Sequence, residues 1–211
     1  VLDQVWAKHC AHLGELVRYA DDFVVMCPTA QDCEQAQRRI EHVLGRLGLK
    51  LHPQKTRRVV LTEGREGFDF LGCHMHKRMS GRLWQQKGLR RYYLQRWPSR
   101  KAMNRVRERV RQLTPRARCH ADVRGVIAQI NPVLRGWGQY FSTGNAANQF
   151  IAVDDYVHWR LKRLQVKRAG RNLKAGRAQH WDREYFESFG LHRLRGTIRY
   201  PGKPPGNRRA A

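Results

Sequence analysis

Two short apolar runs flank a pair of adjacent aspartates near the start of the chain. Residues 16–19 and 23–26 are each too short for a stable helix, and both are rich in β-branched or aromatic side chains. This pattern predicts a strand–turn–strand hairpin with Asp21 and Asp22 at its tip. Turns are commonly acidic, so the ordinary interpretation of the pair as a solvated turn stays open at this point.

Adjacent carboxylates at a stiff hairpin tip suit a divalent metal ion. Like charges held side by side repel each other, and a bound cation removes that repulsion. Ligand sets made only of oxygen favour Mg²⁺, which keeps coordination positions for water and phosphate. Two such ions about 3.5–4 Å apart hold the attacking and leaving oxygens in phosphoryl transfer. The sequence therefore predicts Asp21 and Asp22 as magnesium ligands.

Four segments together resemble a known protein family. They are residues 16–25 around Tyr19-Ala20-Asp21-Asp22, residues 48–56, residues 68–73 and residues 131–141. In this order they are similar to the catalytic hairpin, the segment after the palm helix, the primer-grip hairpin and the thumb signature of reverse transcriptases encoded by group II introns. Reverse transcriptases of retrons and diversity-generating elements are a weaker alternative, because the thumb signature favours the intron class.

The resemblance implies a fold and a role for each motif. The fold would be α+β, with part of a reverse-transcriptase palm over residues 1–76, a helical thumb or maturase (X) domain over residues 77–200, and a basic disordered tail over residues 201–211. The catalytic residues would be Tyr19, Asp21 and Asp22, and the primer grip would consist of Phe70, Leu71 and Gly72. Lys55 would neutralise phosphate charge near the site.

The family also has parts that the matched segments do not include. Its fingers and a further metal-ligating aspartate come before the region matched by residues 1–15. We therefore expect an N-terminally incomplete chain that binds dNTP only with the missing half, and that extends no primer alone. Asp3 lies in a segment predicted to be helical and is a poor substitute for the absent aspartate.

Positive charge is confined to one part of the chain. The formal net charge is +25, yet residues 1–76 hold ten Lys or Arg and ten Asp or Glu, whereas residues 77–211 hold 32 against 7. Such segregation predicts a module that binds a polyanion, most naturally nucleic acid, with steep salt dependence. A membrane surface is the rival partner, but no apolar run approaches the ~20 residues of a span. With no visible signal peptide, we expect a soluble intracellular protein, in the cytoplasm of a bacterium.

Apolar stripes at helical spacing predict three helices in the basic part. They cover about 100–113, 122–143 and 146–168, and Asn131-Pro132 is expected to break or kink the second. We expect their basic residues to hold intron RNA or a template–primer duplex by the phosphate backbone; these residues are Arg105, Arg107, Arg109, Arg111, Arg160, Lys162, Arg163, Lys167 and Arg168. Trp137 and Tyr140 fall on the stripe, which favours a place in the core over base stacking.

The first part of the chain is expected to contain one helix and further strands. Thr29 followed by Asp32 predicts a capped helix to about Leu47, with Gly48 as its end. Residues 57–62 and 67–73 are predicted as strands around a turn at 63–66. Five scattered cysteines without a C-x-x-C motif indicate a reducing compartment, and the His/Cys clusters at 9–12 and 73–76 lack the paired spacing of a structural zinc site.

Two interpretations of function follow from these features. The first is an RNA-directed DNA polymerase that copies intron RNA and also assists splicing as a maturase. The alternative is a non-catalytic maturase remnant that binds and stabilises intron RNA through its basic helices. Loss of Asp21 separates them, since RNA binding should survive it and primer extension should not.

Overall fold

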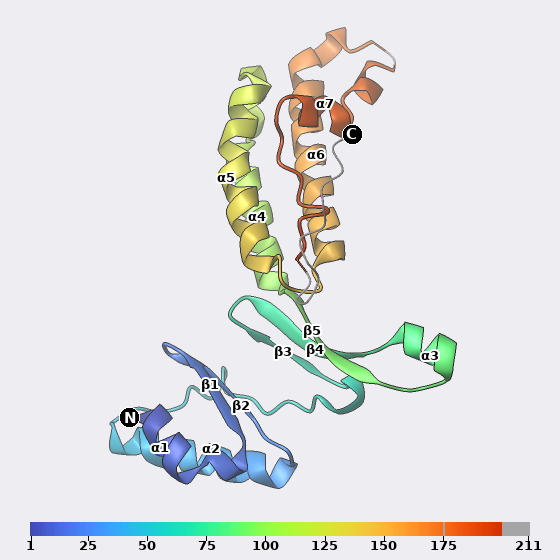
Figure 1. Cartoon of the computed structure of the whole chain (residues 1–211). Coiled ribbons are helices and arrows are strands. Elements are labelled where there is room, and N and C mark those ends of the chain that lie inside the picture. The colour runs from blue at the N-terminus through green and yellow to red at the C-terminus, as the bar shows by residue number, and fades with distance from the viewer. Residues whose placement is uncertain (175, 200–211) are drawn as a thin grey trace.

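The computed structural model describes residues 1–174 and 176–199, and its α+β fold falls into three parts along the chain (Figure 1). A β-hairpin with two helices forms one end, a three-stranded sheet lies in the middle, and a bundle of helices stands on the sheet. The α+β class expected from the sequence is confirmed. The predicted tail of residues 201–211 lies outside the described residues.

The N-terminal part consists of α1 (Leu2–His9), the hairpin β1 (Glu15–Tyr19) and β2 (Asp22–Met26), and α2 (Ala30–Arg46). The two strands pair antiparallel, as predicted. One face of the hairpin covers a small core whose buried members are Trp6, Cys10, Leu13, Ala36 and Ile40. The side chain of Thr29 accepts a hydrogen bond from the amide of Asp32 at 3.1 Å, which confirms the predicted cap of α2.

The middle part is an antiparallel sheet in the order β3 (Gly67–Phe70), β4 (Cys73–Met79) and β5 (Tyr92–Pro98). The predicted strand at 57–62 is wrong, because residues 57–61 form no strand and Thr62–Gly64 is a 3₁₀ turn. The partner of β3 is instead β4, since Leu71 and Gly72 adopt φ of 48° and 76° and reverse the chain.

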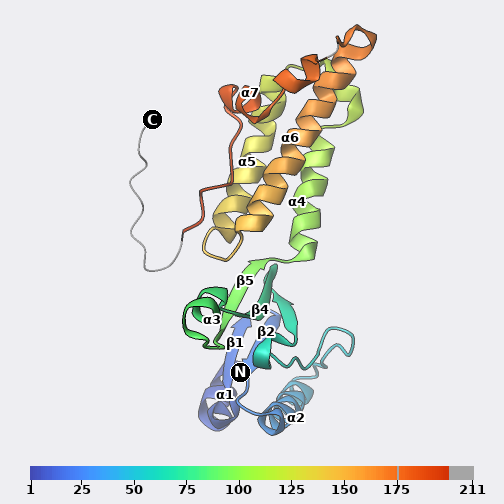
Figure 2. The same ribbon diagram turned by 90° about the vertical axis from the view of Figure 1, so that its right-hand side faces the viewer.

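Neither β5 nor α3 (Gly81–Lys87), which connects β4 to β5, was expected from the sequence. The stretch that forms them mixes basic, aromatic and polar residues without a clear period of two or 3.6. The two views show α3 projecting from the end of the β4–β5 pair that lies away from the helix bundle (Figures 1 and 2).

Three long helices form the bundle: α4 (Arg100–Leu113), α5 (Val123–Phe141) and α6 (Ala147–Ala169). They lie side by side in both views, and the short helix α7 (Arg183–Ser188) closes their far end (Figures 1 and 2). The core contains apolar side chains from all three, including Val110, Ile130 and Leu161, which are almost fully buried. The helices therefore match the predicted ranges closely, and none in the described part of the chain is both long and apolar enough to cross a bilayer.

Asn131 does not end a helix, so the predicted break before Pro132 is wrong. Helix α5 runs through Pro132 without interruption. The side-chain amide of Asn131 instead binds the segment that follows α7. Its Nδ2 donates to the carbonyl of Gly190, and its Oδ1 accepts from the backbone N–H of His192, both at 2.8 Å. The side chain of Asn131 therefore makes contacts far along the chain and does not cap a helix as predicted.

Candidate catalytic hairpin and nucleic-acid interface

The tip of the β1–β2 hairpin is a two-residue loop of Ala20 and Asp21. Tyr19 and Asp22 are directly opposite each other across the two strands. Opposed residues project from the same face of a sheet, and here that face is the one turned away from the small core, since Phe23 packs on the other side. Tyr19, Asp21 and Asp22 are all exposed. The structure therefore brings the three predicted catalytic residues together at one open tip.

Arg18 ties this tip to the first helix. Its Nε donates to both carboxylate oxygens of Asp3, at 2.9 and 3.0 Å, and its Nη1 donates to the carbonyl of Ala20 at 2.9 Å. The hydrogen bond from Arg18 lowers the pKa of Asp3, and the same contact raises the pKa of Arg18. Asp3 is thus engaged in positioning the hairpin, which the sequence did not reveal.

The donor set at the tip fits a magnesium ion in part. Neither Asp21 nor Asp22 takes part in any ion pair between described residues, so their oxygens are open to a cation. Carboxylate oxygens are the ligands that Mg²⁺ prefers. However, residues 1–174 and 176–199 contain no group of three or more His, Cys, Asp or Glu side chains arranged to hold a metal. The two aspartates of the hairpin are by themselves too few to make such a group.

Of the predicted primer grip, Phe70 ends β3 and Leu71 and Gly72 form the turn to β4, which residues at the base of the bundle hold by hydrogen bonds. The hydroxyl of Tyr140 on α5 donates to the carbonyl of Leu71 at 2.8 Å, and the amide of Ser99, which caps α4, donates to the carbonyl of Gly72 at 2.8 Å. Leu71 is held in a left-handed conformation that costs a non-glycine residue about 1–2 kcal/mol. Two fixed hydrogen bonds therefore keep this turn against the base of the helices.

The two aromatic residues predicted for the core behave differently. Trp137 is half-buried, with its ring centroid 4.9 Å from that of Phe141 and 5.4 Å from that of Phe150, so the core prediction holds for it. Tyr140 is 60% exposed, and for this residue the prediction is wrong. Its hydroxyl reaches the primer-grip turn, a non-local contact that helical spacing alone cannot show.

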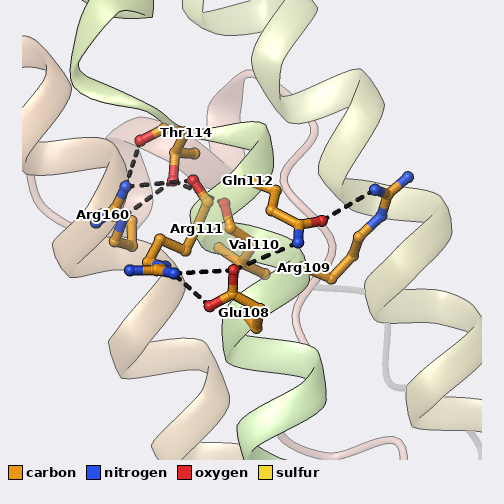
Figure 3. Close-up of polar contacts among 7 residues, drawn as sticks. All are labelled: Glu108, Arg109, Val110, Arg111, Gln112, Thr114 and Arg160. Atoms are coloured by element: carbon orange, nitrogen blue, oxygen red, sulfur yellow. Dashed lines mark hydrogen bonds and ion pairs between the residues drawn. The ribbon is translucent and has the colours of Figure 1, made fainter.

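Arg160 has a structural role that differs from the predicted one. Its Nε donates to the hydroxyl of Thr114 at 2.9 Å, and its Nη2 donates to the carbonyls of Thr114 and Arg111 (Figure 3). These carbonyls lie at the C-terminal end of α4, where helix carbonyls run short of partners, and that of Arg111 also accepts from the backbone amide of Thr114 at 3.2 Å. The guanidinium of Arg160 is half-buried and caps α4, so this residue has a structural role beside the phosphate contact predicted for it, which stays a prediction.

The four arginines predicted on α4 lie on two flanks of that helix. Residues four apart share a face, which pairs Arg105 with Arg109 and Arg107 with Arg111. The second pair faces α6: the guanidinium of Arg107 lies 6.0 Å from the ring centroid of Tyr156, and the backbone carbonyl of Arg111 accepts a hydrogen bond from Arg160. Arg111 is also paired with Glu108 at 2.8 Å, while Arg109 donates to Gln112 (Figure 3).

An exposed tryptophan on α6, which sequence reasoning missed, completes this surface. Trp159 is 46% exposed, and the guanidinium of Arg163 lies 4.7 Å from its ring centroid. We call the surface formed by Arg107, Arg111, Tyr156, Trp159 and Arg163 the α4–α6 face. The signal in the sequence was an aromatic pair inside a basic helix. Of the other predicted basic residues, Lys162 is half-buried, and three are exposed: Lys167, Arg168 and Lys55.

Two family models match separate parts of the chain. Residues 2–75 match the reverse transcriptase (RNA-dependent DNA polymerase) model, and residues 103–186 match the model of the group II intron maturase-specific domain. The chain belongs to the group II intron reverse transcriptase/maturase family. A search of curated proteins gives no match.

The two matches divide this reverse transcriptase/maturase in an informative way. The reverse transcriptase match includes both the aspartate tip and the turn at Leu71 and Gly72, and the maturase match includes the whole α4–α6 face. Residues 76–102, which form most of β4 together with α3 and β5, lie between the two matches.

Proposed function

We propose that this chain supplies the metal-binding hairpin, the primer grip and the duplex-binding thumb of an RNA-directed DNA polymerase that is also a splicing maturase. The observation that carries the proposal is the open pair Asp21 and Asp22 on a hairpin held rigid by the Arg18–Asp3 contact, within the part that matches reverse transcriptases. A turn with only a structural role has no need of two unpaired carboxylates side by side.

Each part of the chain has a place in the proposed reaction. When bound, a Mg²⁺ pair neutralises the charge that develops on the transferred phosphate and on the attacking and leaving oxygens. Asp21 and Asp22 would hold it, and Tyr19 would lie beside the primer end. Phe70 and the turn of Leu71 and Gly72 would position the primer strand. The α4–α6 face and the exposed Lys167 and Arg168 would hold the duplex by its phosphates, as A-form duplexes are recognised mainly by shape and backbone.

Two carboxylates are too few for a metal pair, so the proposal requires a further ligand from outside the described residues. In the resembled family an upstream palm strand provides that aspartate, and the fingers bind the dNTP. Because pre-positioned charges supply most of the catalysis of phosphoryl transfer, we expect half a site to be almost inactive.

Extension of a labelled DNA primer on an RNA template in Mg²⁺ tests this proposal. We expect no product from the chain alone and clear extension once a separately expressed fingers-and-upper-palm fragment from the same locus is added. Asp21→Asn should abolish that extension, whereas Glu15→Gln, an exposed acid at the other end of β1, should leave it unchanged. Equal extension by wild type and Asp21→Asn would refute the metal role.

A second candidate is the non-catalytic maturase, favoured by the location of the charge. The entire net charge of +25 lies in residues 77–211, which include the maturase match. Under this alternative, neither the chain nor the mixture extends a primer, while intron RNA binding stays tight, salt-sensitive and indifferent to Asp21→Asn.

A further inference from the structure

The segment between the two family matches has an unusual composition. Residues 76–102 contain nine Lys or Arg and no Asp or Glu. The segment runs along β4, out through α3 and back along β5, so its charges are spread over an arm that projects from the sheet (Figures 1 and 2). A run this basic forms a surface that attracts polyanions.

Aromatic rings gather on one face of the same strands. In the pairing of β4 with β5, His74 is opposite Trp97, His76 is opposite Gln95, and Arg78 is opposite Tyr93. Opposed and alternate residues share a face, so these side chains form one surface. We call the set His74, His76, Arg78, Tyr93 and Trp97 the aromatic sheet face. The rings of His74 and Trp97 have centroids 5.1 Å apart, and the guanidinium of Arg78 lies 4.8 Å from the Trp97 ring centroid.

These rings contribute to neither hydrophobic core. Among the described residues, both core clusters lack every member of the aromatic sheet face. Tyr93 is 48% exposed, and Trp84 on α3, 43% exposed, has the guanidinium of Arg90 5.1 Å from its ring centroid. The Nδ1 of His76 is shielded from solvent and has no hydrogen-bond partner within residues 1–174 and 176–199. The hydrophobic cores therefore do not account for the exposed rings of Tyr93 and Trp84, while His74, His76 and Trp97 are half-buried and pack against one another.

One carboxylate shares the face, and it is already engaged. Asp69 on β3 is opposite His74, and its Oδ1 lies 2.6 Å from the Nδ1 of that residue. It is at the edge of the surface, away from Arg78 and Tyr93, and the nine basic residues outnumber it. The charge of the whole arm thus remains complementary to a polyanion.

We propose that the aromatic sheet face and the projecting α3 bind single-stranded nucleic acid by stacking its unpaired bases. Exposed rings flanked by arginines stack on bases of any sequence, while Lys and Arg follow the phosphates. A duplex cannot offer its base faces to such rings, so the ligand is an unpaired strand. This goes beyond the duplex binding proposed for the α4–α6 face, which lies on other helices.

Anisotropy titration of the full chain with three labelled oligonucleotides tests the inference. The probes are a single-stranded uridine homopolymer, an abasic strand of the same length, and an RNA duplex. We expect Tyr93→Leu and Trp97→Leu each to weaken uridine binding roughly five- to a hundredfold, the range found when a stacking ring is removed. Both should leave duplex affinity unchanged. The abasic strand, which keeps the phosphates, should bind wild type more weakly than uridine does and should not respond to either variant.

One control and one further variant keep the outcome decisive. Tyr92→Leu changes a ring on the other face of β5, opposite Met79, and should leave uridine binding as in wild type. Trp84→Leu removes an exposed ring of the projecting α3 and should weaken uridine binding as Tyr93→Leu does, so these two variants answer the question even if Trp97→Leu unfolds. Equal affinity for uridine and abasic strands, or wild-type binding by Tyr93→Leu and Trp84→Leu, would overturn the inference. Neither result affects duplex binding, so the proposed function is tested separately.

Discussion

Gly136 and Gly138 lie two positions apart in α5 and meet different surroundings. A Cβ on Gly136 would meet nothing within 4 Å, whereas a Cβ on Gly138 would lie 2.5 Å from Cδ2 of the fully buried Leu194. Alanine is favoured over glycine in a helix by about 1 kcal/mol, and a forced contact in a packed core costs about 1–3 kcal/mol. We therefore expect Gly136→Ala to raise the free energy of unfolding. We expect the free energy of unfolding of Gly138→Ala to be lower than that of Gly136→Ala by about 1–3 kcal/mol. Urea unfolding followed by circular dichroism measures both, and equal stability of the two variants would contradict the close contact with Leu194.

At the scale of elements, two arginines on α6 have different roles, Arg160 in stability and Arg163 in the proposed binding of RNA. Arg160 caps α4, while Arg163, one turn away, lies over the exposed Trp159. Arg160→Met should lower the free energy of unfolding by about 1–3 kcal/mol, since hydrogen bonds from a charged group to helix-end carbonyls are lost. Arg163→Met should leave stability unchanged and reduce the slope of log affinity for an RNA duplex against log salt by about 1, the change expected for one lost phosphate contact. The converse pattern in unfolding and salt titrations would show that the two roles are exchanged.

The elements also show how far the sequence can predict this molecule. Hairpin β1–β2 and helices α2, α4 and α6 follow from local patterns, because short runs of β-branched and aromatic residues, helical spacing and a cap such as Thr29 act within a few residues. Strand β5, the unbroken α5 and the engagement of Arg160 depend on partners far along the chain. At the candidate site, the aspartate tip was predictable as a motif. Its fixation by Asp3, and the contact of Tyr140 with the primer-grip turn, required the tertiary structure.

On the scale of the whole molecule, the described residues form two hydrophobic cores of unequal size. Five buried residues hold the N-terminal part, and nineteen hold the bundle. No hydrogen bond or ion pair among the described residues joins the β1–β2 hairpin to residues 67–98. A small core is marginally stable by itself, so we expect the N-terminal part to open first. Hydrogen exchange in rising urea should show β1 and β2 losing protection before α5 and α6, and simultaneous loss in one transition would contradict this.

Two hydrogen bonds couple the position of the helix bundle to that of the turn of Leu71 and Gly72. Ser99 at the foot of α4 and Tyr140 near the end of α5 both grip the same two-residue turn, from different helices. A tilt of the bundle cannot leave the turn behind without breaking one of these bonds. If the helix bundle acts as a thumb and shifts when it closes on a duplex, Leu71 and Gly72 would shift with it. Contacts to the primer and contacts to the duplex would then change together.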